Sequence, residues 1–437
     1  MVGRKSSVKP EAYEEYLRGT YAMNAGEFEK GMQSMEKAVQ LDPNFARAHA
    51  DLANARYWLV FFGFLSPKEA FPQIRDLANK ARELDETLPE AHGTLALIKL
   101  NYDWDWVGAE QEFKRALELN PSQSDIRHDY AHFLMAVGRN DDALEESMRA
   151  VEIDPFTPVL TACLGWHYMS AQQYDRAIAQ LQEGLKLDPN GFWWHIILGW
   201  CYEQQKKFKE AIAEFQLASK LSGGSSLAQG TLGHAYAASG RMPEARRILD
   251  MLLEQSSKSY VSAYDIASIY IGLGQKEKTF QWLDKAYDER SSYLIHVKWD
   301  PRFKNLHSDS KFRQLLKNIG LESGSVAQTK ESRLNENSGA ETHAKWQNSI
   351  AVLPFKNISS DKEQEYFCDG MTEQLITNLT NLPNVKVIAR TSVMQFKNSG
   401  KTIQHIANKL GVAHVLEGSV RKSGNKIRVT AQLIKAD

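Results

Sequence analysis

Small residues recur every 34 positions between Ser124 and Ser291, at the same three places in each unit. The first column, which bulky apolar residues flank, consists of Ala131, Gly165, Gly199, Gly233 and Ala267. The second column consists of Ala143, Ala177, Ala211, Ala245 and Thr279, and the third of Ala150, Gly184, Ala218, Leu252 and Ala286. Two antiparallel helices approach to about 8–10 Å only where small side chains lie at their crossing. The pattern therefore predicts five stacked helix–turn–helix units.

Three further units precede this array. The offsets of its small residues recur at Gly19, Gly31, Ala38 and Pro43 in a first unit, and residues 90–121 form a third. The second unit, residues 45–89, carries the aromatic insertion YWLVFFGFLSPKEAF, which either packs across a neighbouring unit, the favoured interpretation, or makes an exposed contact. Residues 295–321 break the register, and a helix from about Asp309 is expected to cap the open end of the solenoid. The fold class expected for residues 10–321 is a mainly α solenoid of about eight units.

The hydrophobic pattern changes after this region. Residues 322–347 are polar and without periodicity, which predicts a flexible linker. Beyond them, SIAVLPF and VKVIA are typical of strands, EYFCDGMTEQLITNLTNL and TIQHIANKLG of helices, and the last segment of a hairpin turning at residues 423–425. Residues 348–437 are therefore expected to form a small α/β domain that ends on a strand, with nothing after it to cover the sheet.

Composition narrows the class of protein. The net charge of −1 provides no overall attraction to nucleic acid or to an anionic membrane. The three cysteines are scattered and form no CxxC pair, which argues against a disulfide framework or a zinc knuckle. The first ten residues lack the apolar core of a signal peptide, and the longest apolar run, residues 57–65, is too short to span a bilayer. A reduced, cytoplasmic protein is expected.

Both modules resemble known families. The period of 34 residues is that of tetratricopeptide repeats, and YDWDWVGAEQEFKRALELNP is similar to the repeats of bacterial multidomain signalling regulators. SIAVLPFKNISSDKEQEYFCDGMTEQL and IANKLGVAHVLEGSVRKSGNKIRVTAQLI resemble the TolB-like (FlgO-related) domain of the same regulators. In that family the TolB-like domain precedes the repeats and continues through a further strand and helix. The resemblance therefore implies an incomplete domain here, in a rearranged or truncated gene product or in an adaptor without its own output module.

No motif supports catalysis by this chain. SGKT at residues 399–402 lacks the earlier glycine of a phosphate-binding loop, because that position is Gln395. His128 and His132, spaced four apart on a helix, are the right pair for one face of a metal site. No third ligand is evident locally, so ordinary groove-facing histidines are favoured. We expect no catalytic residue, no metal and no cofactor.

In tetratricopeptide arrays the first helix of each unit lines the concave face. The resemblance implies that the side chains at positions two, five, nine and twelve of each unit face this groove. The aromatic, histidine and methionine side chains at these positions are His128, His132, Met135, Trp166, Met169, Trp193, Trp200, His234 and Tyr264. Exposed aromatic patches mark binding surfaces, so these residues predict a groove for an apolar or aromatic-bearing peptide or helix. The alternative, weighed equally, is that residues 295–321 or tighter packing fill the groove.

These patterns lead to two hypotheses about function. The first is a non-enzymatic scaffold in bacterial signal transduction that binds a protein partner in the groove. The second is a sensory or regulatory fragment of a larger nucleotide cyclase, Ser/Thr kinase or winged-helix regulator. Ten basic and two acidic residues give residues 384–437 a charge of +8, but no aromatic side chains are interleaved with them, so a solvated sheet face is favoured and no nucleic acid is expected.

Overall fold

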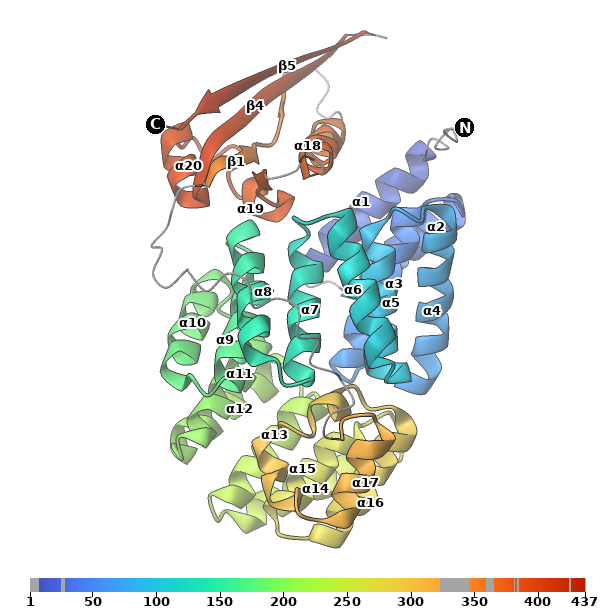
Figure 1. Cartoon of the computed structure of the whole chain (residues 1–437), viewed down its shortest axis with the longest axis vertical. Helices are drawn as coiled ribbons and strands as arrows, with labels where there is room; N and C mark the ends of the chain where they lie inside the picture. Colours follow the sequence, from blue (N-terminus) through green and yellow to red (C-terminus); the bar gives the residue numbers. More distant parts are fainter. Residues whose placement is uncertain are drawn as a thin grey trace.

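The computed structural model describes residues 8–24, 28–322, 346–358, 365–380, 382, 385–423 and 426–436. Within them, α1 to α16 form eight helical hairpins that stack into the expected solenoid (Figure 1). The first helices of the hairpins are α1 (Pro10–Asn24), α3 (Ala46–Phe61), α5 (Pro89–Ile98), α7 (Ser124–Ala136), α9 (Pro158–Ser170), α11 (Phe192–Gln204), α13 (Ser226–Ala238) and α15 (Ala263–Gly272). The second helices are α2 (Phe28–Leu41), α4 (Pro67–Leu84), α6 (Trp106–Leu119), α8 (Asn140–Ile153), α10 (Tyr174–Leu187), α12 (Phe208–Leu221), α14 (Met242–Ser256) and α16 (Lys276–Glu289).

The small-residue columns lie at the helix crossings, as predicted. A Cβ atom added at Gly165 would lie 2.7 Å from Cγ of Leu181 in the paired helix. At Gly199 it would lie 2.3 Å from Cε1 of Phe215. Both distances are shorter than ordinary van der Waals contacts, so the absence of a side chain is what lets the two helices of each hairpin approach.

The turns within the hairpins share one backbone conformation. Gly138, Gly240 and Gly274 have φ angles of 83°, 83° and 71°, which confirms that these glycines occupy left-handed turns. The equivalent positions of the two intervening hairpins are Gln172 and Lys206, both with φ of 60°. Stacking of the repeats therefore imposes the same turn on residues that adopt it less readily than glycine.

The irregular segments reach into the solenoid. The aromatic insertion lengthens α3, and a π-helix, η1 (Lys99–Asp103), precedes α6. After α16 come two 3₁₀ helices, η2 (Ser292–His296) and η3 (Pro301–Leu306), and the expected final helix, α17 (Ser310–Asn318). This part of the chain contacts much earlier hairpins, because Trp299 Nε1 donates to the carbonyl of Ala136 at 2.9 Å and Trp106 Nε1 donates to that of Ile319 at 2.7 Å.

The C-terminal region is a small α/β unit. Its strands are β1 (Trp346–Val352), β2 (Lys356–Asn357), β3 (Lys386–Val387), β4 (Val412–Ser423) and β5 (Lys426–Lys435), and its helices are α18 (Glu365–Thr380), α19 (Arg390–Met394) and α20 (Ile403–Leu410). Strand β4 pairs in parallel with β1 and β2 on one side and antiparallel with β5 on the other, while β3 pairs in parallel with β1. The expected strands, helices and hairpin are present; the turn at residues 424–425 lies outside the described residues.

The α/β unit packs on the solenoid near α1 and the end of α8 (Figure 1). The backbone N–H of Ala389 donates to the carbonyl of Ile153 at 3.1 Å. The Ser392 hydroxyl accepts from the N–H of Phe156 at 3.1 Å and donates to the carboxylate of Asp154. Residues 323–345 of the predicted linker lie outside the described residues.

Candidate binding site inside the solenoid

The predicted groove residues do converge, and three tryptophans form their centre. The ring centroids of Trp166 and Trp193 lie 5.3 Å apart, those of Trp193 and Trp200 5.6 Å apart, and those of Trp166 and Trp200 6.2 Å apart. The rings come from α9 and α11, the first helices of neighbouring hairpins, which brings together three of the residues that the register assigned to the groove.

Two segments of the same chain cover these rings, and we call them the closing segments: residues 58–62 at the end of α3, and residues 292–306. Phe62 packs 5.9 Å from Trp193, and Tyr293 packs 6.4 Å from the same ring. His296 lies 5.1 Å from Trp166. As a result the three tryptophans are only 3–8% exposed. The structure thus favours the alternative in which the chain fills its own groove. Burial of these rings removes a large apolar area from water and so stabilises the closed arrangement.

The last two predicted groove residues bind polar partners inside the protein. Nδ1 of His234 lies 2.7 Å from a carboxylate oxygen of Glu203, and the Tyr264 hydroxyl donates to Asp300 at 2.7 Å. Tyr264 is 1% exposed and contributes to the core rather than to an open trough.

A buried ion pair, which the sequence pattern did not reveal, fixes the second closing segment. Asp300 and Arg302 are joined by a distance of 2.6 Å, and their side chains are 9% and 7% exposed. Burial alone would raise the pKa of Asp300, but the neighbouring Arg302 guanidinium holds it below its usual value of 3.8. In the sequence, the pair is visible only as an acidic and a basic residue two positions apart in the segment WDPR. This segment lies outside the repeat register, so its position in the fold could not be inferred from the repeats.

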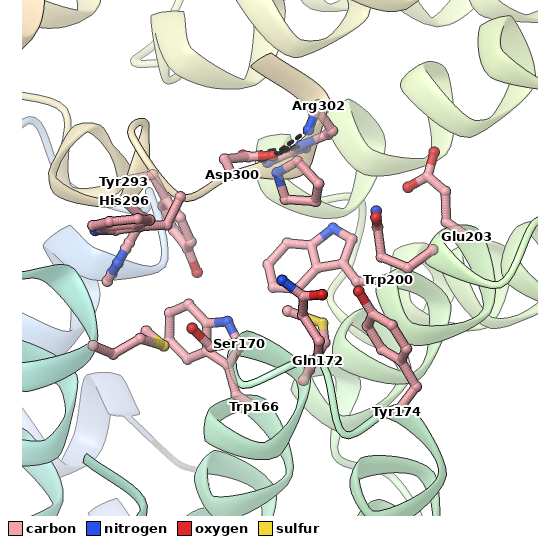
Figure 2. Close-up of a pocket in the computed structure, with 15 residues that line it drawn as sticks. Trp166, Ser170, Gln172, Tyr174, Trp200, Glu203, Tyr293, His296, Asp300 and Arg302 are labelled. Atoms are coloured by element: carbon pink, nitrogen blue, oxygen red, sulfur yellow. Dashed lines mark hydrogen bonds and ion pairs between the residues drawn. The ribbon is translucent and has the colours of Figure 1, made fainter. Parts of the chain in front are cut away.

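One pocket of about 140 Å³ remains between the array and the second closing segment (Figure 2). Four predicted groove residues line it: Met135, Trp166, Met169 and Trp200. The lining also includes polar side chains from both sides, among them Ser170, Gln172, Tyr174, Glu203, Gln204, Asp300 and Arg302. A cavity of roughly 150 Å³ accepts a single benzene-sized group, so this pocket suits one side chain or small molecule and is too small for a helix.

A histidine cluster lies deeper in the interior. Nε2 of His128 and Nε2 of His132 are 3.0 Å apart, and Nδ1 of His132 lies 3.3 Å from Nε2 of His167. Burial holds the pKa of His132 and that of His167 well below 6.5, so both imidazoles are neutral near pH 7. Burial would also lower the pKa of His128, but Cys163 and Asp129 reverse this effect and raise it well above 6.5. Cys163 is not apparent from the spacing of His128 and His132, because it belongs to the next unit of the array. The signal was the next unit, whose first helix packs beside α7.

A second, larger cavity of about 650 Å³ lies where the α/β unit meets the solenoid. The charged residues on its solenoid side are mostly acidic, and its basic residue Arg47 bonds Glu90 and Asp51 at 2.9 Å each. Burial raises the pKa of Asp125 in its wall to about 6. Arg390 of the α/β unit also lines this space, and its Nε lies 4.0 Å from a carboxylate oxygen of Glu373 in the same unit.

Both parts of the chain match models of known protein families. Models described as tetratricopeptide repeat match residues 16–45, 105–162, 164–226 and 204–264, and the helical array is therefore built of tetratricopeptide repeats. A model of the HilA/YgeH-like transcriptional regulator, second domain, matches residues 346–437. The resemblance had implied a TolB-like domain for these residues, and this match does not confirm that assignment.

Individual relatives share only parts of the chain. A Rhizobium meliloti protein named "Putative adenylate cyclase 3" is 51% identical over 86 residues, which are 20% of this chain and 15% of the relative. The transcriptional regulator HilA of Salmonella typhimurium is 27% identical over 133 residues, 30% of this chain and 24% of HilA. The chain thus spans less than a quarter of the length of either relative.

Solved structures with similar helical arrays are more distant in sequence. The human IFIT1 dimer with m7Gppp-AAAA is 16% identical, with a TM-score of 0.45, over 73% of this chain and 89% of that one. A Pseudomonas aeruginosa pilF structure is also 16% identical, with a TM-score of 0.35, over 48% of this chain and 95% of that one. Among the described residues, no helix combines the length and the apolar character needed to cross a membrane.

Proposed function

We propose that this chain is a non-enzymatic protein-interaction scaffold that holds a partner through one apolar anchor side chain in the pocket beside Trp200. A bound helix along the whole concave face, the broader form of the groove hypothesis, does not suit a face that the closing segments occupy. The partner would be a peptide or loop that inserts a single side chain.

The observation that carries this proposal is the composition of the pocket. Met135, Met169 and Trp200 offer apolar surface, while Glu203 and Arg302 offer charge of both signs at its wall. An anchor that enters the pocket would bury its apolar surface against these side chains, with charged groups beside it, which is the combination typical of interface hot spots.

Selection of phage-displayed peptides on the full chain tests the proposal. Met169, a partly buried pocket residue, is changed to Glu, and Met251, which is 43% exposed on α14, is changed to Glu as the matched control. We expect the selected peptides to share an apolar anchor and to bind Met169→Glu at least about 10-fold more weakly, or about 1.4 kcal/mol, with Met251→Glu unaffected. Equal binding to both variants would rule out this pocket as the site.

A second candidate is a regulatory part of a larger bacterial signalling protein located in the cytoplasm. It is favoured by the match of residues 346–437 to a domain of a transcriptional regulator and by the similarity to a protein named as an adenylate cyclase. The TolB-like assignment and the division at residues 322–347 belong to this proposal. Genomic sequence on both sides of the reading frame tests it: an adjoining cyclase, kinase or winged-helix domain is expected, and unrelated genes on both sides would contradict it.

A further inference from the structure

Three potential metal ligands from neighbouring hairpins meet inside the solenoid. His128 and His132 belong to α7 and Cys163 to α9, and one ligand atom from each lies within 4.8 Å of the other two. All three side chains are buried, with exposed fractions of 3%, 8% and 2%. The two helices are the first helices of consecutive units, so the stacking of the repeats creates the group.

The orientation of the two imidazoles is the more specific observation. Their Nε2 atoms face each other at 3.0 Å. Each ring has a neighbour at its other nitrogen, because Asp129 Oδ1 lies 3.2 Å from Nδ1 of His128 and His167 Nε2 lies 3.3 Å from Nδ1 of His132. Metal-binding histidines are held in this way, with the outer nitrogen on a carboxylate or another polar group and the inner nitrogen on the metal.

The spacing is also close to that of a metal site. Two imidazole nitrogens at about 2.0–2.1 Å from a tetrahedral Zn²⁺ are separated by about 3.3 Å, and the observed 3.0 Å requires only a small adjustment. Thiolate and imidazole together suit Zn²⁺ and Cu⁺, whereas Mg²⁺ and Ca²⁺ prefer oxygen ligands.

We propose that His128, His132 and Cys163 bind one thiophilic transition-metal ion, Zn²⁺ or Cu⁺, that ties α7 to α9. On binding, the Cys163 thiol and the His128 imidazolium each release one proton to solvent, and the two imidazoles then bind as neutral donors through Nε2. A non-protein ligand completes the tetrahedron of Zn²⁺, whereas Cu⁺ is satisfied by the three side chains. The role is structural, and the metal-linked hairpins support the adjacent aromatic interior, where His132 packs 4.8 Å from Trp166.

Metal analysis of the full chain provides the first test. The protein is produced in media supplemented with Zn²⁺ or with copper, and metal per chain is measured by mass spectrometry after gel filtration. About one equivalent of one of the two metals is expected, and which medium yields it distinguishes zinc from copper. Less than about one tenth of an equivalent from both media would overturn the proposal.

Cobalt substitution and matched cysteine variants test the ligands. Protein refolded with Co²⁺ is expected to show a thiolate-to-cobalt charge-transfer band. Cys163→Ser should lose the band and at least about 90% of the bound metal, whereas Cys201→Ser, a change at the equally buried thiol of α11, should retain both. Circular dichroism confirms that each variant folds. If Cys163→Ser fails to fold, the unmodified chain still decides the matter, since a cobalt spectrum without a thiolate band contradicts Cys163 as a ligand.

Discussion

The regular array from α7 to α16 and the closing segments are built on different principles. In the array, a glycine of one helix faces a bulky residue of its partner helix, and the contact of Gly165 with Leu181 recurs 34 residues later as that of Gly199 with Phe215. In the closing segments, each contact occurs once, such as that of Phe62 with Trp193 or the ion pair of Asp300 with Arg302. The difference teaches that a repeat period predicts which helix faces meet, but not what occupies the space that they enclose.

The largest effect is expected in the second closing segment. Arg302→Met leaves Asp300 buried without its partner, and breaking such a pair costs about 3–5 kcal/mol. The free energy of unfolding, measured by urea denaturation, should fall by this amount. The double variant Asp300→Asn, Arg302→Met should recover much of the loss, because no unpaired charge remains. A single variant as stable as the unmodified protein would show that the pair does not hold the segment.

Asp265, in α15 of the array, predicts a dependence on pH. Burial raises the pKa of this carboxyl from 3.8 to about 7, even though Ser226 donates to it at 2.8 Å. Between these two values the unfolded chain is ionised and the folded chain is protonated, so the stability contributed by this group falls as the pH rises from about 4 to 7. The loss from pH 5 to pH 7.5 is on the order of 2 kcal/mol.

The matched variant for this prediction is Asp265→Asn, which cannot ionise. The difference in unfolding free energy between variant and unmodified protein should grow in favour of the variant as the pH rises from 5 to 7.5. A constant difference across this range would contradict a raised pKa at Asp265.

A smaller effect is expected at a helix crossing of the array. Gly199→Ala places a Cβ against the ring of Phe215, and overpacking of this kind costs about 1–3 kcal/mol. Because alanine favours a helix over glycine by about 1 kcal/mol, the net loss should be about 1 kcal/mol. Adding Phe215→Leu, which shortens the opposing side chain, should remove the cost of the alanine and leave its advantage in the helix of up to about 1 kcal/mol. If the alanine costs as much in that background, the crossing is not the cause.

The smallest effect concerns a turn of the array. Lys206 adopts a φ angle of 60°, in the left-handed region. The equivalent positions of two other units are occupied by glycines, Gly138 and Gly240. Lys206→Gly should raise the thermal midpoint slightly, by the equivalent of up to about 1 kcal/mol. Lys207→Gly, one residue later, serves as the control and should not stabilise the protein. A lower midpoint for Lys206→Gly would indicate that this turn is not strained by lysine.

Much of the fold could be predicted from the sequence, because the determinants are local and periodic. The columns that contain Gly165 and Gly199 required the hairpins, and alternating apolar runs after residue 348 required the strands and helices of the α/β unit. The convergence of Trp166, Trp193 and Trp200 also followed from the register, and the structure confirms their mutual contacts.

The rest of the candidate site could not be predicted, because it depends on contacts between distant segments. Nothing near Trp193 in sequence indicates that Phe62 and Tyr293 cover it. The grouping of His128 with Cys163 arises only when two units stack side by side. Docking of Ser392 on Asp154 likewise joins residues that are 238 positions apart.

The central claim is that the chain closes its own concave face, and hydrogen–deuterium exchange on the full protein tests it most directly. Peptides covering residues 292–306 should exchange slowly, with protection close to that of α11 and α13, because the segment is held by Asp300, Arg302 and the aromatic rings beneath it. Exchange of residues 292–306 within seconds, while α11 remains protected, would contradict the claim and show that the concave face is open.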